Sequence, residues 1–267
     1  MRTHWSRLHT VGSLLLIAVF VGLAIVQPLT AYQSWIVVMI GMVIFTMIVG
    51  HGITGVWQGA LVDERLRMSL SRLQLLLWTI LIVSAFATIA VMRMSSDAVN
   101  ALNVGVPETI WALLGISATS LIGSPLIKNT EKNAPAPSVD RIEKVAADQG
   151  ADPNAITVVG NVVKNTDINQ ASIADIFMGE YFTNFALLDL GKIQLFFFTM
   201  LLVISYGTAI GSLLRTDPMP SSLPDVGAGM LPLLGISHTG YLAHKVVTSP
   251  DDHPDVVRPA DATHPNQ

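Results

Sequence analysis

The fold of this chain follows from the stretch SLSRLQLLLWTILIV at residues 69–83, because a related stretch, DLGKIQLFFFTMLLV, stands at residues 189–203. The two align without a gap at an offset of 120 residues, and six of their fifteen positions are identical, a glutamine and a threonine among them. The same offset places the LLGIS of residues 113–117 on the LLGIS of residues 233–237. A polar set in constant register across two apolar segments and the loop between them predicts a duplicated two-helix hairpin.

The composition is that of a membrane protein. Of the 267 residues, 51% are hydrophobic and 13% charged, and the mean hydropathy is +0.54, far from the values of a soluble domain. A helix needs about 20 apolar residues to cross the hydrocarbon core. We therefore predict an all-α polytopic membrane protein with six transmembrane helices. Each helix corresponds to a long apolar segment, or window, that lacks Asp, Glu, Lys and Arg. These windows are Val11–Val26, Ala31–Gly50, Leu73–Met92, Thr109–Ile127, Ile193–Leu214 and Val226–Ala243.

The distribution of Lys and Arg predicts the orientation, because cytoplasmic loops retain positive charge during insertion. If the N-terminus is cytoplasmic, 13 of the 15 basic residues lie in the cytoplasm and only Arg93 and Arg215 lie on the other side of the membrane. Both termini are then cytoplasmic, and the two hairpins are parallel repeats about an axis along the membrane normal. A five-span alternative leaves Val226–Ala243 in the membrane interface. We expect a multi-pass protein of a bacterial inner membrane.

The predicted spans divide the chain into six segments. The connector after the first hairpin predicts either an amphipathic helix lying on the cytoplasmic face or an ordinary charged loop. The insert between the repeats predicts a helix from Ser138 through Ala147, a strand from Ile156 to Val163 and a turn capped by Ser172. About 60 residues is marginal for an independent core, so we expect the insert to pack on the membrane domain or a partner. The segments are residues 1–50 (N-terminal hairpin), 51–72 (connector), 73–127 (first repeat), 128–192 (cytoplasmic insert), 193–247 (second repeat) and 248–267 (disordered tail).

Seven polar residues of the predicted spans are candidates for lining a pore. The duplicated glutamines, serines and threonines would contribute equivalent rings in an oligomer, and His238 breaks the symmetry because Ala118 aligns with it. Each candidate also has a packing explanation, in which it forms a hydrogen bond of about 1 kcal/mol with a neighbouring helix. The candidates are Gln74, Gln194, Ser117, Ser237, Thr119, Thr239 and His238.

Small residues spaced four apart predict a packing ridge on each of the fourth and sixth spans. In lipid, such ridges let helix backbones approach closely and drive association, so we predict a homo-oligomer in the bilayer. One ridge is Gly115, Thr119 and Gly123, and the other is Gly235, Thr239 and Ala243.

Several kinds of chemistry lack the residues they need. The chain has no cysteine, which removes disulfides, thiolate nucleophiles and cysteine-based metal sites. It contains no phosphate-binding loop, dinucleotide fingerprint, zinc motif or nucleophile elbow, and His51 has no second metal ligand at helical spacing. A net charge of −4 without a basic run argues against a nucleic-acid partner. We expect no enzyme activity, no metal and no cofactor.

Two functions from different classes remain. The first is an oligomeric pore or channel-type subunit for ions or small solutes, and it rests on duplicated polar positions without coupling carboxylates. The second is a membrane anchor or scaffold subunit that docks a partner protein through its cytoplasmic insert, and it rests on the length of that insert. A proton-linked carrier that uses His238 is a third hypothesis.

Overall fold

Within the described part of the chain, the computed structural model has four helices long and apolar enough to cross a membrane. They are α1 (Arg7–Val26), α2 (Ala31–Thr54), α3 (Leu70–Ser95) and α6 (Leu190–Thr216). Each coincides with a predicted span, which confirms a predominantly helical, membrane-embedded protein. The structure describes residues 4–27, 29–96, 100–116, 118, 119, 132, 133, 136–217, 219–227, 229, 232, 235, 236, 239 and 240.

Local sequence sets where these helices begin and end. The N–H of Thr30 donates to the side chain of Gln33 at 3.1 Å, and the Thr30 hydroxyl accepts from the Gln33 N–H at 3.4 Å, so a capping box starts α2. Gly55 ends this helix in the left-handed region, at a φ of 82°, which costs glycine little. Asp189 accepts from the Lys192 N–H at 3.1 Å and starts α6.

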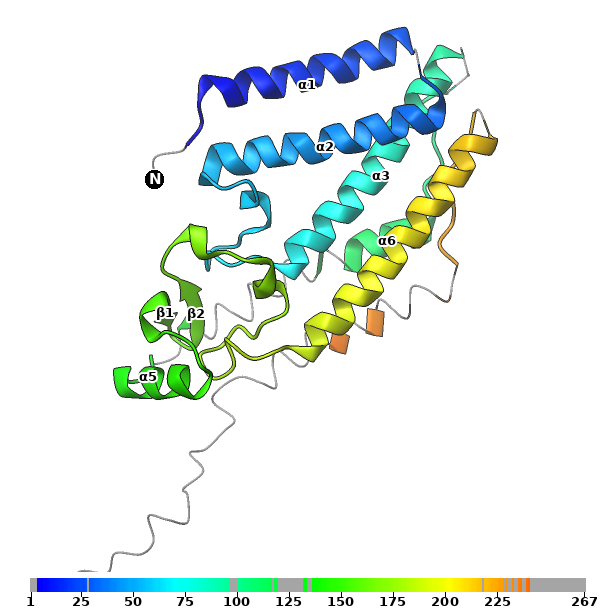
Figure 1. Cartoon of the computed structure of the whole chain (residues 1–267). Helices are drawn as coiled ribbons and strands as arrows, with labels where there is room; N and C mark the ends of the chain where they lie inside the picture. The colour runs from blue at the N-terminus through cyan, green and yellow to red at the C-terminus, as the bar shows by residue number, and fades with distance from the viewer. Residues whose placement is uncertain are drawn as a thin grey trace, which may run out of the picture.

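α3 is the central helix of the bundle. It packs against both α2 and α6, and α1 lies along α2 (Figure 1). Half of the apolar window of α3 is buried, compared with 6% of the window of α1. The apolar surface of α1 is therefore left for lipid or for another chain.

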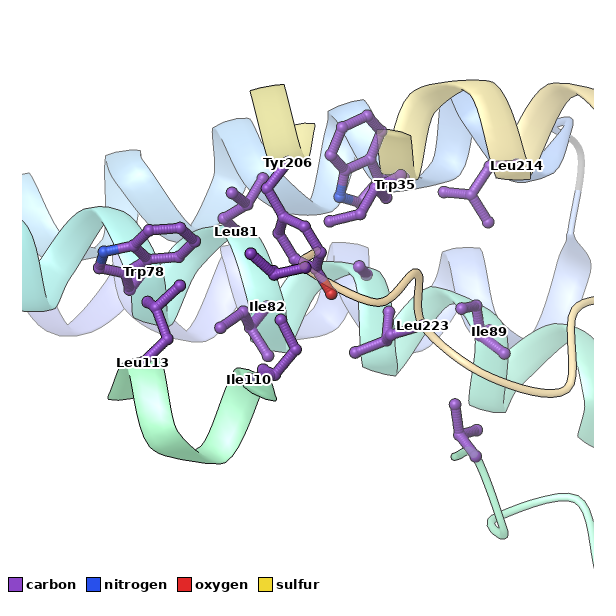
Figure 2. Packing of buried hydrophobic residues seen from close by; sticks show 14 of the residues in the cluster. Trp35, Trp78, Leu81, Ile82, Ile89, Ile110, Leu113, Tyr206, Leu214 and Leu223 are labelled. Atoms are coloured by element: carbon purple, nitrogen blue, oxygen red, sulfur yellow. The ribbon is translucent and has the colours of Figure 1, made fainter. Parts of the chain in front are cut away.

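The apolar core lies between α2, α3 and α6 and is built around large aromatic side chains (Figure 2). Trp78 is fully buried on α3 and its ring lies 6.2 Å from that of Tyr206 on α6. The indole N–H of Trp35 donates to the Ser84 hydroxyl at 3.0 Å, and the Tyr206 hydroxyl donates to the Pro224 carbonyl at 3.1 Å. Aromatic bodies thus fill the core while their polar ends find partners.

The predicted spans 109–127 and 226–243 are described only in part. Residues 108–116 are helical, and Ile110 and Leu113 of this run pack into the core, where Leu113 lies beside Trp78 (Figure 2). Most of the remaining positions of the two windows lie outside the described residues. The count of six spans therefore stays a prediction.

The two ends of the bundle are organised differently. At the end we call the insert end, α3 and α6 begin and α2 leads into the connector (Figure 1). At the opposite end, the loops after α3 and α6 pair through their backbones. The Gly105 N–H donates to the Ser221 carbonyl at 2.9 Å, and the Leu223 N–H donates to the Gly105 carbonyl at 2.9 Å. α3 and α6 are thus tied together beyond their C-terminal ends.

The insert forms a small α+β unit at the insert end. Its helix α5 (Val139–Asp148) begins at Ser138, whose hydroxyl accepts from the Arg141 N–H at 3.4 Å, so the predicted cap is confirmed. The predicted strand 156–163 is wrong in its extent, because Gly160, at a φ of 58°, turns the chain back. Two antiparallel strands result, β1 (Ile156–Val159) and β2 (Val162–Asn165). Short 3-10 turns complete the unit at Pro153–Ala155, Ile168–Gln170 and Ile173–Ile176, the last of them capped by Ser172 as predicted.

The connector 51–72 is not an interfacial helix. α2 continues to Thr54, a 3-10 turn follows at Gly59–Leu61, and Val62 then pairs with Met68 in an isolated antiparallel bridge. Leu66 takes a φ of 57° at the tip of this turn, and such a backbone is incompatible with a continuous helix. The physical reason is that the two arginines of the turn are buried against the insert rather than solvated.

Candidate functional site

A buried ion network joins the connector, the insert and the first turn of α6. Its side chains are all at least nine-tenths buried, which is rare for charged groups unless they are paired. Three cations and three carboxylates balance each other, so the network carries no net formal charge. We call these residues the junction cluster: Asp63, Arg65, Arg67, Asp175, Glu180 and Lys192.

Arg65 bridges two carboxylates from opposite sides of the junction. Its guanidinium lies 2.9 Å from the Asp63 carboxylate on the same turn and 3.1 Å from the Glu180 carboxylate of the insert. Lys192 of α6 reaches the same Glu180 carboxylate at 3.2 Å and donates to the Met178 carbonyl at 2.6 Å. Glu180 therefore holds one cation from the connector and one from α6.

Arg67 is a second buried link between the connector and the insert. It donates to the Asp175 carboxylate at 3.1 Å, to the Gly179 carbonyl at 3.0 Å and to the Phe185 carbonyl at 3.3 Å. The other oxygen of Asp175 accepts backbone N–H groups from Met68 at 3.1 Å and Ser172 at 2.9 Å. Burial, together with nearby Arg65, lowers the pKa of Arg67, and the Asp175 carboxylate opposes this shift. Ion pairing thus compensates for part of the desolvation.

Backbone hydrogen bonds extend the junction along β2. The Asn165 N–H donates to the Arg65 carbonyl at 3.0 Å, and the Asn165 side chain donates to the Leu66 carbonyl at 2.8 Å. The polar backbone at the strained tip of the connector is therefore satisfied by the insert. Connector and insert are thus joined by backbone as well as by ion pairs.

The junction cluster attaches the insert to the helix bundle through buried ion pairs. Removing one partner of a buried ion pair typically costs about 3–5 kcal/mol, because a charge is left uncompensated. The insert is held by such pairs to both α3, through the connector, and α6. Its orientation relative to the bundle is consequently fixed.

Gln74 and Gln194, which align in the repeat, lie in different surroundings. Gln74 is buried and donates to the hydroxyl of Thr199 on α6 at 2.5 Å, whereas Gln194 is exposed on α6. The buried face of α6 is displaced by one residue relative to that of α3, so equivalent side chains point about 100° apart. The structure thus brings together Gln74 and a threonine that was not among the candidates.

The other candidates are described only in part. Thr119 is exposed and donates to the carbonyl of Gly115 on its own helix at 2.8 Å, and Thr239 is exposed. A Cβ atom added at Gly115 or Gly235 would meet no atom of the described residues within 4 Å. No described helix packs on these two ridge glycines. Outside the described residues lie Ser117, Ser237, His238, Gly123 and Ala243.

Tertiary structure pairs two histidines whose positions in sequence gave no signal. A ring nitrogen of His9 on α1 lies 2.9 Å from a ring nitrogen of His51 on α2, and the His51 ring lies 4.4 Å from that of Trp57. The described ranges contain no group of three side chains placed to hold a metal ion. The two rings form a contact between α1 and α2.

The junction cluster was the feature that sequence reasoning missed. Its two arginines stand in the charged stretch DERLR at residues 63–67, but this stretch forms a turn with Leu66 at a φ of 57°. Nothing in it indicates the carboxylates of Glu180 and Asp175, which stand 115 residues from Arg65 and 108 residues from Arg67. Comparison of the chain with protein families, with curated proteins and with solved structures finds no match. Function is therefore inferred from the geometry of the chain itself.

Proposed function

We propose that this chain is a multi-pass membrane scaffold that holds its insert in a fixed orientation at the cytoplasmic face, where a second protein docks. The junction cluster carries this proposal. A linker without a docking role has no need of a fixed orientation, and flexible linkers are made from Gly, Ser and solvated charges. Here three buried cations and three carboxylates fix the insert to α3 and α6.

The free surface of the insert supports a protein as the docking partner. Val139 on α5 is 68% exposed and Val159 on β1 is 42% exposed, although other apolar residues of the same two elements pack into the core of the insert. Apolar side chains on a rigid polar unit are typical of docking faces. The partner we propose is a protein with a complementary apolar patch.

We infer six spans with both termini in the cytoplasm and a parallel repeat of the hairpins. The start of α3 and the start of α6 lie at the same end, because Arg65 and Lys192 share the Glu180 carboxylate there. Arg93 and Arg215 stand in the last turns of the same helices, at the opposite end. This charge asymmetry supports the insert end as cytoplasmic and a bacterial inner membrane as the location.

Labelling of single introduced cysteines tests this topology. The natural chain gives no labelling signal of its own, because it has no cysteine. Asn154→Cys on the insert and Ser221→Cys at the opposite end are both exposed positions. A membrane-impermeant maleimide should label Ser221→Cys in intact cells. It should label Asn154→Cys only after the cells are permeabilised. Labelling of both from outside, or the reverse pattern, contradicts the inferred orientation.

Surface variants test the scaffold better than deletion of the insert, because deletion removes Asp175, the carboxylate partner of Arg67, and Glu180, one of the two partners of Arg65. Full-length Val139→Asp should lose a defined second protein from complexes isolated from native membranes, at unchanged expression. Asp152→Asn, at an exposed position of the same unit, should retain it. A chain that is isolated alone or only with copies of itself, in cross-linked and mild-detergent extracts alike, contradicts the scaffold.

An oligomeric pore for ions or small solutes is the second candidate. Among the described residues, no atom lies within 4 Å of a Cβ atom added at Gly115 or Gly235, and this favours the pore because another copy of the chain can approach the backbone there. Purified protein in liposomes should pass ions or small solutes, and Ser117→Leu with Ser237→Leu should block the flux. Flux no greater than that of empty liposomes rules out the pore.

A further inference from the structure

A cavity of about 320 Å³ opens at the insert end, between the last turns of α2 and the connector. One wall is apolar and consists of Phe45, Val49 and Ile53 of α2. The connector closes the other side at Gly59, where the chain passes so near α2 that an added Cβ atom would lie 2.7 Å from the Gly50 carbonyl oxygen. The cavity is therefore a built feature of this crossing.

Arg72 is the charged residue that lines this cavity, and no carboxylate lines it. Its side chain is half-buried, yet it forms no ion pair or hydrogen bond with any described residue. The aligned residue of the second repeat, Lys192, is buried and paired with Glu180 at 3.2 Å. The two equivalent cations have therefore diverged, one into a structural ion pair and one into a cavity.

Nothing in the described protein compensates the charge of Arg72. It stands in the first turn of α3, where the helix dipole favours anions and disfavours a cation. The acidic side chains of the nearby connector are already engaged, Asp63 by Arg65 at 2.9 Å and Glu64 by Lys132 at 2.6 Å. A half-buried guanidinium beside an apolar wall thus has capacity for an external anion.

We propose that Arg72 binds the phosphate of an anionic phospholipid whose acyl chain lies along Phe45, Val49 and Ile53. A guanidinium presents parallel N–H donors that match phosphate oxygens, and basic pockets between membrane helices suit anionic headgroups. The cavity lies where two span-length helices meet the connector, which is headgroup depth for this leaflet. The apolar wall selects a lipid over a soluble phosphate, because free phosphate leaves that wall bare.

A second cavity, of about 380 Å³, provides room for a second acyl chain. It shares Thr46 and Ala60 with the first and is lined on α3 by Leu76, Leu77 and Ile80. The two cavities flank the place where the connector approaches α2. A phospholipid with two chains can therefore straddle this crossing with its phosphate at Arg72.

Native mass spectrometry of the delipidated full chain tests the proposal with phosphatidylglycerol, phosphatidylcholine of the same acyl chains, and inorganic phosphate as probes. The natural chain should prefer phosphatidylglycerol, and Arg72→Gln should weaken that binding by about tenfold or more, the usual loss for a charge-assisted contact. Arg7→Gln removes an exposed cation at the start of α1 and should leave the preference unchanged. Because Arg72 has no described partner, its variant should keep the melting temperature of the lipid-free protein.

Filling the cavity separates the acyl-chain contact from the charge. Val49→Trp should weaken the binding of both lipids, although Arg72 is retained. The comparison uses only a Val49→Trp protein whose circular dichroism matches that of the natural chain. Arg72→Gln with an unchanged preference for phosphatidylglycerol overturns the proposal. Inorganic phosphate that binds or competes as well as the lipid overturns it too, in favour of a soluble anion, and an unchanged lipid affinity in a folded Val49→Trp removes the cavity as the site.

Discussion

Gln74 on α3 donates a hydrogen bond of 2.5 Å to the hydroxyl of Thr199 on α6. Thr199 donates its own proton to the Leu195 carbonyl at 2.8 Å, so the amide is anchored to the backbone of the neighbouring helix. In the aligned sequence, the partner of Gln74 is Gln194 and the partner of Thr199 is Thr79. Contact between α3 and α6 thus joins non-equivalent positions of the repeat, as expected when a central and a peripheral helix bury different faces.

The first prediction concerns the two aligned glutamines. Gln74→Leu should lower the free energy of unfolding by about 0.5–1.5 kcal/mol, because a buried interhelical hydrogen bond is lost. Gln194→Leu, the same substitution at an exposed position, should change it by less than about 0.5 kcal/mol. Reversible unfolding in mixed micelles measures both, and equal effects would show that the two helices bury equivalent faces.

The second prediction concerns the junction cluster. Arg67→Met should destabilise the insert by about 3–5 kcal/mol, because the Asp175 carboxylate is left buried without its cation. Hydrogen exchange should then rise throughout residues 156–180 while α2 and α3 keep their protection. Lys144→Met, at an exposed position of α5, serves as the control and should leave exchange unchanged.

A double variant checks the cause of that loss. Arg67→Met combined with Asp175→Asn removes both charges, and the new amide still offers an oxygen to the Met68 and Ser172 N–H groups. The pair should recover part of the stability lost in Arg67→Met, giving a favourable coupling energy in a double-mutant cycle. Additive losses would mean that the two side chains stabilise the insert independently.

The third prediction concerns the crossing of the connector over α2. Gly59→Ala should destabilise the protein by more than about 1 kcal/mol, because the new methyl group would lie 2.7 Å from the Gly50 carbonyl oxygen and overlap the Thr54 hydroxyl. Gly22→Ala on α1 meets no atom within 4 Å and should be neutral or slightly stabilising through helix propensity. Thermal unfolding of the two variants in the same detergent compares them directly.

The fourth prediction concerns the hydroxyl of Tyr206. Tyr206→Phe should lower stability by about 0.5–1.5 kcal/mol, because the Pro224 carbonyl loses its donor. Tyr32→Phe is the matched control, since the Tyr32 ring lies 3.9 Å from the Arg215 guanidinium, and phenylalanine preserves a ring at that place. A larger loss in Tyr32→Phe than in Tyr206→Phe would contradict the assigned roles.

Local sequence rules predicted the long helices and two of the caps, because apolar length and capping depend on nearby residues. Apolar length identified α1, α2, α3 and α6, and Ser138 and Ser172 cap the elements expected of them. The same rules extended one strand too far at Gly160, where a glycine reverses the chain rather than continuing it. For the connector they left two alternatives, an interfacial helix and an ordinary charged loop, because its mixture of apolar and charged residues is compatible with both.

The sequence by itself determined that this is a membrane protein with long apolar helices, because the cost of placing polar groups in hydrocarbon accumulates residue by residue along the chain. Only the tertiary structure decided which charges are buried and which remain free. Arg67 meets Asp175, 108 residues away, and Lys192 is paired while the aligned Arg72 faces a cavity. Such differences depend on which face of each helix finds a neighbour, and hydropathy carries no information about that choice.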